Sequence, residues 1–266
     1  MKAYTALLKK QDRYLYLLRY LPSRYWASIL TTALYVKYPD FDALKKLLVS
    51  YYYQTWIAGG TITRIKPTSI NIIKNVKSNK GIETIKELIL HNIDSYNTFN
   101  QYFYNLWDSS SVYPSKWVRP VLALANYFMA DEEKPHFIVM DAETQVEHIL
   151  PQNPKKRGSQ WNADFNKEKR EEWVNRIANL TLLKRKKNAK ALNGDFDEKR
   201  KIYGGKDTSK VISCYDITKK LYSDYRKWNE NSLQEQHEFL YDIITPVLHI
   251  EGQEEGYEYE DELDLE

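Results

Sequence analysis

The sequence predicts a mainly helical, α+β protein in which a helical N-terminal domain precedes a small unit of two strands and one helix. Two observations lead to this fold class. Through the first 135 residues, apolar side chains recur at steps of three and four, which is the period of an amphipathic helix. Two short apolar runs near residues 144 and 179 have instead the length and composition of strands. We therefore expect a small sheet wrapped by helices.

The N-terminal part divides into helical segments at its prolines and glycines. These residues end helices because proline lacks a backbone N–H and glycine is too flexible. We expect Pro67 in the first turn of its helix, where the missing N–H has no partner to lose. The expected helices cover residues 4–20, 25–38, 41–57, 62–76, 82–90, 96–106 and 118–129. Residues 1–135 are thus interpreted as a helical bundle that positions the rest of the protein or binds a partner.

The small unit is expected between residues 144 and 192. Residues 144–150 form the first strand and Pro151 ends it, because proline cannot donate a ladder hydrogen bond. Residues 179–183 form the second strand and residues 185–192 the helix. Two more helices, at 216–228 and 233–248, are expected to cover this unit with Trp228, Leu233, Phe239, Leu240, Ile243 and Ile244.

Four residues of this unit have the chemistry needed to hydrolyse a phosphodiester. A neutral imidazole, His148, can take a proton from water. The Glu147 carboxylate and the Asn188 amide are oxygen ligands suited to Mg²⁺, which takes one or two of them from protein. Successive side chains on a strand alternate, so Glu147 and His148 can serve one site only where the strand ends or bends. With Asn179, this order of residues resembles a ββα-metal (HNH-type) nuclease centre.

The wider motif resembles a known family. It consists of Glu-His-Ile-Leu-Pro-Gln from residue 147, Asn-Leu-Thr-Leu-Leu from residue 179, and the run from Asn188 to Tyr203. These segments are similar to the C-terminal HNH domain of GmrSD-type, modification-dependent (type IV) restriction enzymes and related phage-defence nucleases. The resemblance covers roughly residues 140–205.

The resemblance implies a role for each motif residue. His148 would be the general base, Glu147 and Asn188 would bind Mg²⁺ (or Mn²⁺), and Asn179 would hold the strand pair of the catalytic site together. It also implies a nucleotide-dependent module with an Asp-Gly-Gln-Gln-Arg motif, which this sequence lacks. That module is therefore expected as a partner domain or subunit.

Charge is distributed unevenly along the chain. The net charge is +3, but residues 251–266 contain nine acids and no base, so residues 1–250 carry +12. A body that basic is suited to a polyanion. Basic residues near the motif are expected to contact phosphate, although a charge run is more often a solvated helix face: Lys155, Lys156, Arg157, Lys184, Arg185, Lys186, Lys187, Lys190 and Lys199. The acidic tail is expected to be disordered.

Composition excludes several other classes. The single cysteine, Cys214, rules out an internal disulfide and cysteine-rich zinc sites. Neither a signal segment nor a membrane span is recognisable, so we expect a cytoplasmic protein with three parts: residues 1–135, 136–250 and 251–266. The predicted function is a Mg²⁺-dependent DNA endonuclease. The alternative is a non-catalytic DNA-binding or assembly module that keeps a degenerate HNH fold.

Overall fold

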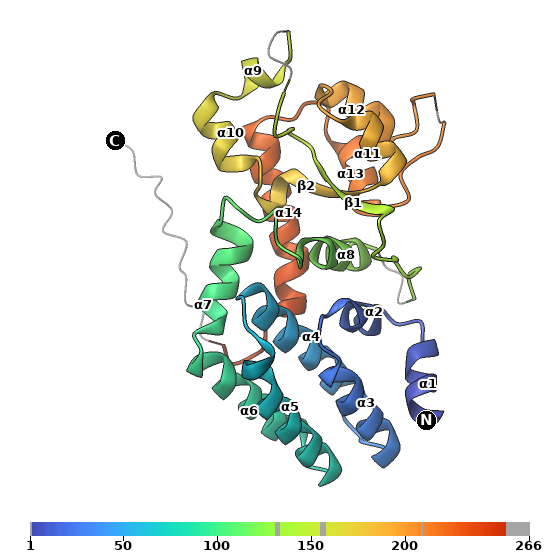
Figure 1. The fold of residues 1–266 in the computed structure, drawn as a ribbon, viewed down its shortest axis with the longest axis vertical. Helices are drawn as coiled ribbons and strands as arrows, with labels where there is room; N and C mark the ends of the chain where they lie inside the picture. The colour runs from blue at the N-terminus through green and yellow to red at the C-terminus, as the bar shows by residue number, and fades with distance from the viewer. Residues whose placement is uncertain (1, 131–133, 155–157, 209, 254–266) are drawn as a thin grey trace.

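The computed structural model describes residues 2–130, 134–154, 158–208 and 210–253. It is mostly helical with a small antiparallel sheet, as the sequence predicts. Figure 1 shows helices α1–α6 at one end of the molecule and the sheet with α9–α13 at the other, while α8 and the long α14 lie between them.

The N-terminal helices follow the predicted order, and most of their ends differ from the predicted ones. Phe41–Ile57 (α4) has the predicted bounds. The segment predicted as one helix from residue 4 is instead two, because Asp12 caps the second: its Oδ1 accepts a hydrogen bond of 3.0 Å from the Leu15 N–H. The remaining elements of this half are α1 (Lys2–Lys9), α2 (Arg13–Tyr20), α3 (Tyr25–Val36), α5 (Ile62–Lys77), α6 (Ile82–Ser95), α7 (Thr98–Phe103), the π-helical turn η1 (Tyr104–Asp108) and α8 (Val118–Phe128).

The predicted place of Pro67 is wrong. It lies inside α5, five residues beyond the first helical residue, Ile62. A proline there deprives the Thr63 carbonyl of its helical partner. Thr63 is exposed in the first turn, so water can satisfy that carbonyl and the helix continues.

The sheet has two antiparallel strands, β1 (Thr144–His148) and β2 (Leu180–Lys184). Thr144 pairs with Lys184, and His148 pairs with Leu180. β1 is two residues shorter than predicted, because the chain turns away after His148. Between the strands lie α9 (Trp161–Asp164), α10 (Lys167–Trp173) and the 3₁₀ turn η2 (Ile177–Asn179), and α11 (Arg185–Ala191) directly follows β2.

Two cores lie on the two faces of this sheet. Leu180 and Leu182 belong to the larger core, which extends from Leu7 to Ile250 and crosses the boundary predicted at residue 135. Leu183 alternates to the other face and belongs to the smaller core with Trp228. The smaller core is enclosed by the remaining elements α12 (Phe196–Tyr203), α13 (Asp216–Asp224) and the start of α14 (Glu230–Leu248).

Helix α14 therefore serves both cores. Leu233, near its start, packs in the smaller core as predicted, and so does Trp228 just before it. Leu240 and Ile244 lie in the larger core, with Phe239 and Ile243 packed against it, and that core includes Leu180 and Leu182 on the other face of the sheet. The helix reaches both cores because its 19 residues extend well beyond the two-stranded sheet.

The segment after α14 is packed, contrary to the predicted start of a disordered tail at residue 251. Gln253 is buried, and its side chain exchanges two hydrogen bonds of 2.9 and 2.8 Å with Gln54 of α4. Glu251 lies 3.4 Å from Lys86. The other residues of the predicted tail, 254–266, lie outside the described part of the chain.

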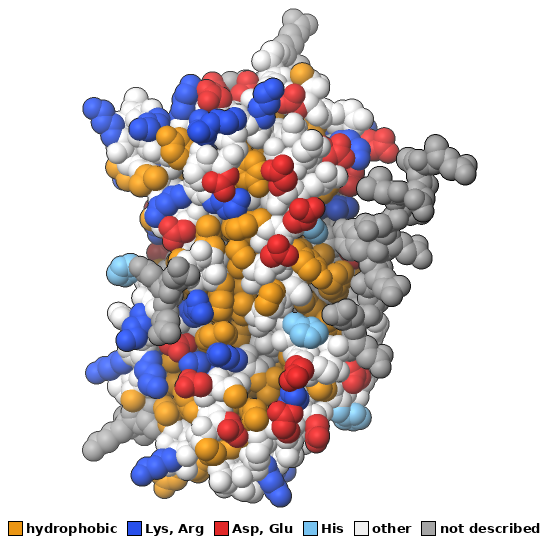
Figure 2. Space-filling model, turned by 180° about the vertical axis from the view of Figure 1, so that it is seen from behind, with side chains coloured by type: hydrophobic (Ala, Val, Ile, Leu, Met, Phe, Trp, Pro, Cys, Tyr) orange, Lys and Arg blue, Asp and Glu red, His pale blue; other side chains and the backbone are white. Residues whose placement is uncertain are grey.

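The reverse face shows how the surface is divided. In Figure 2 hydrophobic side chains gather across the middle of the molecule, with Lys, Arg, Asp and Glu above and below them. Among the described helices, none is both long and apolar enough to cross a bilayer.

Candidate active site

A cleft of about 320 Å³ opens along β1 and is lined by the predicted general base, His148, and both predicted metal ligands, Glu147 and Asn188. β1 supplies the first two and α11 supplies the third. The cleft forms because β1 pairs with β2 on one edge only, and α11 folds back beside the sheet. Its lining is Tyr113, Gln145, Val146, Glu147, His148, Pro151, Arg185, Asn188, Ala189, Leu192 and Asn193.

Glu147 is almost fully buried and holds an ion pair. Its Oε1 accepts hydrogen bonds from Lys199 Nζ at 2.7 Å and from the Tyr203 hydroxyl at 3.2 Å. Lys199 also donates to the carbonyl of His148. Burial raises the pKa of Glu147, and the Lys199 charge opposes that rise. Burial also disfavours the charged form of Lys199 and lowers its pKa, and the Glu147 charge opposes that change. Each charge of the pair thus stabilises the other in surroundings with little water.

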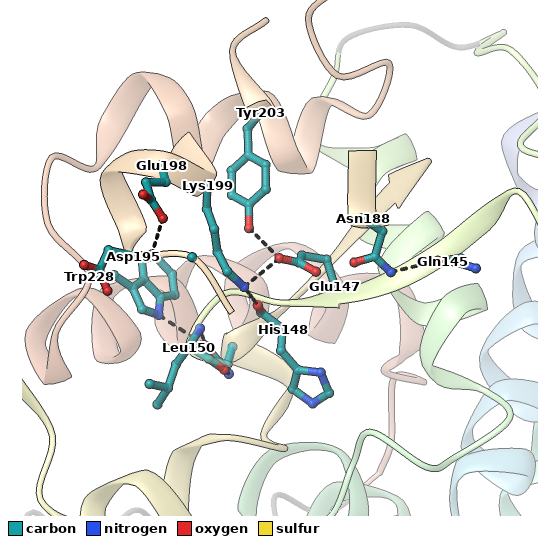
Figure 3. Close-up of polar contacts among 12 residues, drawn as sticks. Gln145, Glu147, His148, Leu150, Asn188, Asp195, Glu198, Lys199, Tyr203 and Trp228 are labelled. Atoms are coloured by element: carbon teal, nitrogen blue, oxygen red, sulfur yellow. Dashed lines mark hydrogen bonds and ion pairs between the residues drawn. The ribbon is translucent and has the colours of Figure 1, made fainter. Parts of the chain in front are cut away.

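Glu147 and Asn188 direct oxygen atoms toward each other. The Asn188 Nδ2 donates to Gln145 Oε1 at 2.8 Å, and this bond turns the amide oxygen of Asn188 toward the Glu147 carboxylate (Figure 3). Both contacts of Glu147 are made by Oε1, and Oε2 has no hydrogen-bond partner in the described part of the chain. Two oxygen ligands of different residues are thus available in the cleft.

His148 leaves β1 on the opposite face. In Figure 3 its ring points away from the carboxylate of Glu147, as strand alternation requires. Its Nε2 lies 3.1 Å from Asn175 Oδ1, and its ring centroid lies 4.1 Å from that of Tyr113. Burial lowers the pKa of His148 to about 4. The hydrogen bond with Asn175 raises this pKa, and the positive charge of Lys199 lowers it further. The imidazole is therefore neutral at physiological pH.

Asn179 lies outside the cleft and is fully buried. Its Oδ1 accepts from the Leu150 N–H at 2.7 Å and from Trp228 Nε1 at 3.2 Å. Its Nδ2 donates to the carbonyls of Leu150 and Val174, both at 2.9 Å. These bonds attach the chain after β1 to the start of β2. Asn179 therefore holds the strands that carry the cleft residues, although it does not line the cleft itself.

The predicted phosphate-binding residues fall into different environments. Lys199 is fully buried with Glu147 and cannot reach DNA, so that prediction is wrong. Lys187 is also buried, where its amine donates to the Ile202 carbonyl. Arg185 and Lys186 are exposed, and Arg185 lines the cleft. Lys190 is exposed and pairs with Asp207, and Lys184 is half-buried. Lys155, Lys156 and Arg157 lie outside the described residues.

Sequence reasoning missed the contacts around His148. Asn175 and Tyr113 are far from His148 in the sequence, and no local pattern marks either residue. The burial of Lys199 did leave a signal. Phe196, Lys199 and Tyr203 stand at helical spacing, so they share one face of α12, and that face is buried.

The comparisons with known proteins agree with the resemblance noted in the sequence. The family model described as GmrSD restriction endonucleases, C-terminal domain, matches residues 76–243. The match spans more than half of the chain and includes every residue that lines the cleft. It also begins well before residue 135, so part of the helical half, including η1 and α8, belongs to the matched region. No curated protein matches the chain.

Proposed function

Because the chain belongs to the family of GmrSD restriction endonuclease C-terminal domains, we propose that it is a Mg²⁺-dependent endonuclease that hydrolyses DNA. It would act in a modification-dependent restriction or phage-defence system. The observation that carries the proposal is the cleft, which Glu147, His148 and Asn188 all line within the matched region.

The residues present suit a hard cation better than zinc. In the described ranges, no group of three or more His, Cys, Asp or Glu side chains is arranged to hold a metal. Glu147 Oε2 and the Asn188 amide oxygen would be the protein ligands, and Mg²⁺ or Mn²⁺ commonly accepts so few because water and substrate fill the remaining positions. When bound, the ion would stabilise charge that develops on the phosphate.

The chain's own residues supply the other parts of the reaction. His148, neutral at physiological pH, would take the proton of the attacking water. Asn179 would hold the chain between the strands in place. Arg185 and Lys186, exposed beside the cleft, would contact phosphates and add affinity that does not depend on sequence. A nucleotide-dependent partner domain or subunit would control access to DNA.

One observation favours the alternative, a non-catalytic DNA-binding or assembly module. Lys199 lies 2.7 Å from Glu147 and neutralises the only carboxylate among the residues that line the cleft. A nearby cation weakens metal binding by electrostatic repulsion. The endonuclease remains our proposal because the second carboxylate oxygen of Glu147 has no partner among the described residues.

A plasmid-cleavage assay with Mg²⁺ separates the two functions. His148→Ala is expected to lower the cleavage rate by about 10² to 10⁴ without loss of DNA affinity, which is the usual effect of removing a general base. His91→Ala, at an exposed histidine of α6, is the matched control and should cleave normally. DNA binding without cleavage by the wild-type protein, with Mg²⁺ or Mn²⁺, would establish the alternative.

A further inference from the structure

We infer that Asn175 is a positioning residue that orients the His148 ring and keeps its proton on Nε2, so that Nδ1 is the atom that accepts a proton from water. This inference rests on the proposed function and adds an assignment for each ring nitrogen. Asn175 lies between α10 and η2, outside both strands and outside the sequence motif.

The hydrogen bonds around the Asn175 amide fix the direction of donation. Its Oδ1 lies 3.1 Å from His148 Nε2 and also accepts from Gln152 Nε2 at 3.0 Å. An amide oxygen has no hydrogen to donate. The His148 Nε2 must therefore carry the hydrogen of this contact, and in a neutral ring the other nitrogen then carries none.

The remaining ring nitrogen is open. His148 Nδ1 has no hydrogen-bond partner among the described residues and is not one of their buried unpartnered atoms. His148 is one of the residues that line the cleft. A lone pair at Nδ1 can therefore meet a water molecule, whereas Nε2 is engaged.

Asn175 is itself held from the helical half of the protein. Its backbone carbonyl accepts hydrogen bonds from the N–H groups of Val112 and Tyr113, at 3.0 and 3.1 Å. Tyr113 then packs against the His148 ring. The side chain of Asn175 thus contacts one edge of the His148 ring. Its backbone carbonyl holds the loop before α8, which carries the Tyr113 ring that packs against His148.

These two roles use different atoms, which makes the inference testable. A side-chain change removes the bond to His148 but leaves the backbone carbonyl that holds residues 112 and 113. Asn175→Leu has a similar size and no acceptor. Asn175→Asp keeps an acceptor and is the conservative variant. Gln152→Ala is the control, because it removes the other donor to the same oxygen and leaves the His148 contact.

The experiment is nitrogen NMR of histidine-labelled protein at neutral pH, with His148→Ala to assign the signal, together with plasmid cleavage in Mg²⁺. Wild type and Gln152→Ala should show a single tautomer with a slowly exchanging proton on Nε2. Asn175→Leu should lose that protection and lower kcat by roughly tenfold, the effect of one net hydrogen bond, with KM unchanged. Asn175→Asp should restore the protected proton and most of kcat. If Asn175→Leu does not fold, Asn175→Ala replaces it.

Three results overturn the inference. A proton on Nδ1 in the wild type assigns the nitrogens in the opposite way. An unchanged NMR signal in Asn175→Leu, whatever its kcat, shows that Asn175 does not hold the ring, and an altered signal with normal kcat shows that the ring orientation does not matter. A wild-type protein that cleaves no DNA would defeat the proposed function alone, because the NMR result does not depend on cleavage.

Discussion

Replacing Lys199 with methionine should destabilise the protein far more than the loss of a surface lysine would. The Lys199 side chain is 1% exposed and that of Glu147 is 5% exposed, so the substitution leaves a carboxylate without its counter-charge. Breaking a buried ion pair by removing one partner typically costs about 3–5 kcal/mol. The carbonyl of His148 also loses a donor, which costs about 1–3 kcal/mol more. Protonation of Glu147 limits the total, so we expect about 3–5 kcal/mol at pH 7.

The assay is urea unfolding followed by tryptophan fluorescence. Lys201→Met is the matched control on the same helix, because Lys201 is exposed and its ion pair with Asp197 is a surface pair worth at most about 1 kcal/mol. Adding Glu147→Gln to Lys199→Met should recover part of the loss, since neither position of the former pair then carries a charge. A Lys199→Met protein of nearly wild-type stability but weakened DNA affinity would refute this reasoning and restore Lys199 as a phosphate contact.

Four further outcomes follow from the structure. Because burial lowers the pKa of His148 to about 4, the cleavage rate should stay level from pH 8 to about 5 and fall as pH drops through 4; a decline centred near pH 6.5, the usual histidine value, would contradict the burial. Stability should itself decrease below about pH 6.5, because the unfolded state binds a proton that the folded ring does not. Asn179→Ala should cost about 2–4 kcal/mol in urea unfolding, since several buried backbone groups lose their partner, and a loss under 1 kcal/mol would show that Asn179 does not hold the strands. Arg185→Gln with Lys186→Gln should reduce the salt dependence of DNA binding by about 0.9 log units of slope per phosphate contact, whereas an unchanged slope would leave these residues a role in solubility only.

Local patterns predicted the parts of this fold that depend on local physics. Helix α4 has its predicted ends because an apolar face at helical period is bounded by Pro39 and by Gly59. Leu-Thr-Leu-Leu formed a strand as expected, within one residue. The site residues on β1 and α11 also reach one cleft, because the strand and the helix that carry them are neighbours in the fold.

Long-range partners could not be predicted in the same way. Lys199 was interpreted as one more surface charge, because a lysine in a basic chain is normally solvated. Its burial depends on a carboxylate 52 residues earlier in the chain. Asn175 meets His148, Gln152 and the loop before α8 only after the tertiary fold forms, and a single sequence contains no trace of those pairings.

The packed segment after α14 has a consequence for the synthesis of this protein. The larger core uses Ile250, and the reciprocal amide bonds between Gln54 and Gln253 join residues 199 positions apart. Helices α4 and α8 therefore leave the ribosome before α14, which packs against both of them. Chains dominated by such distant contacts fold slowly, since a long loop must close first. Truncations that remove Ile250 should accordingly behave as core mutations.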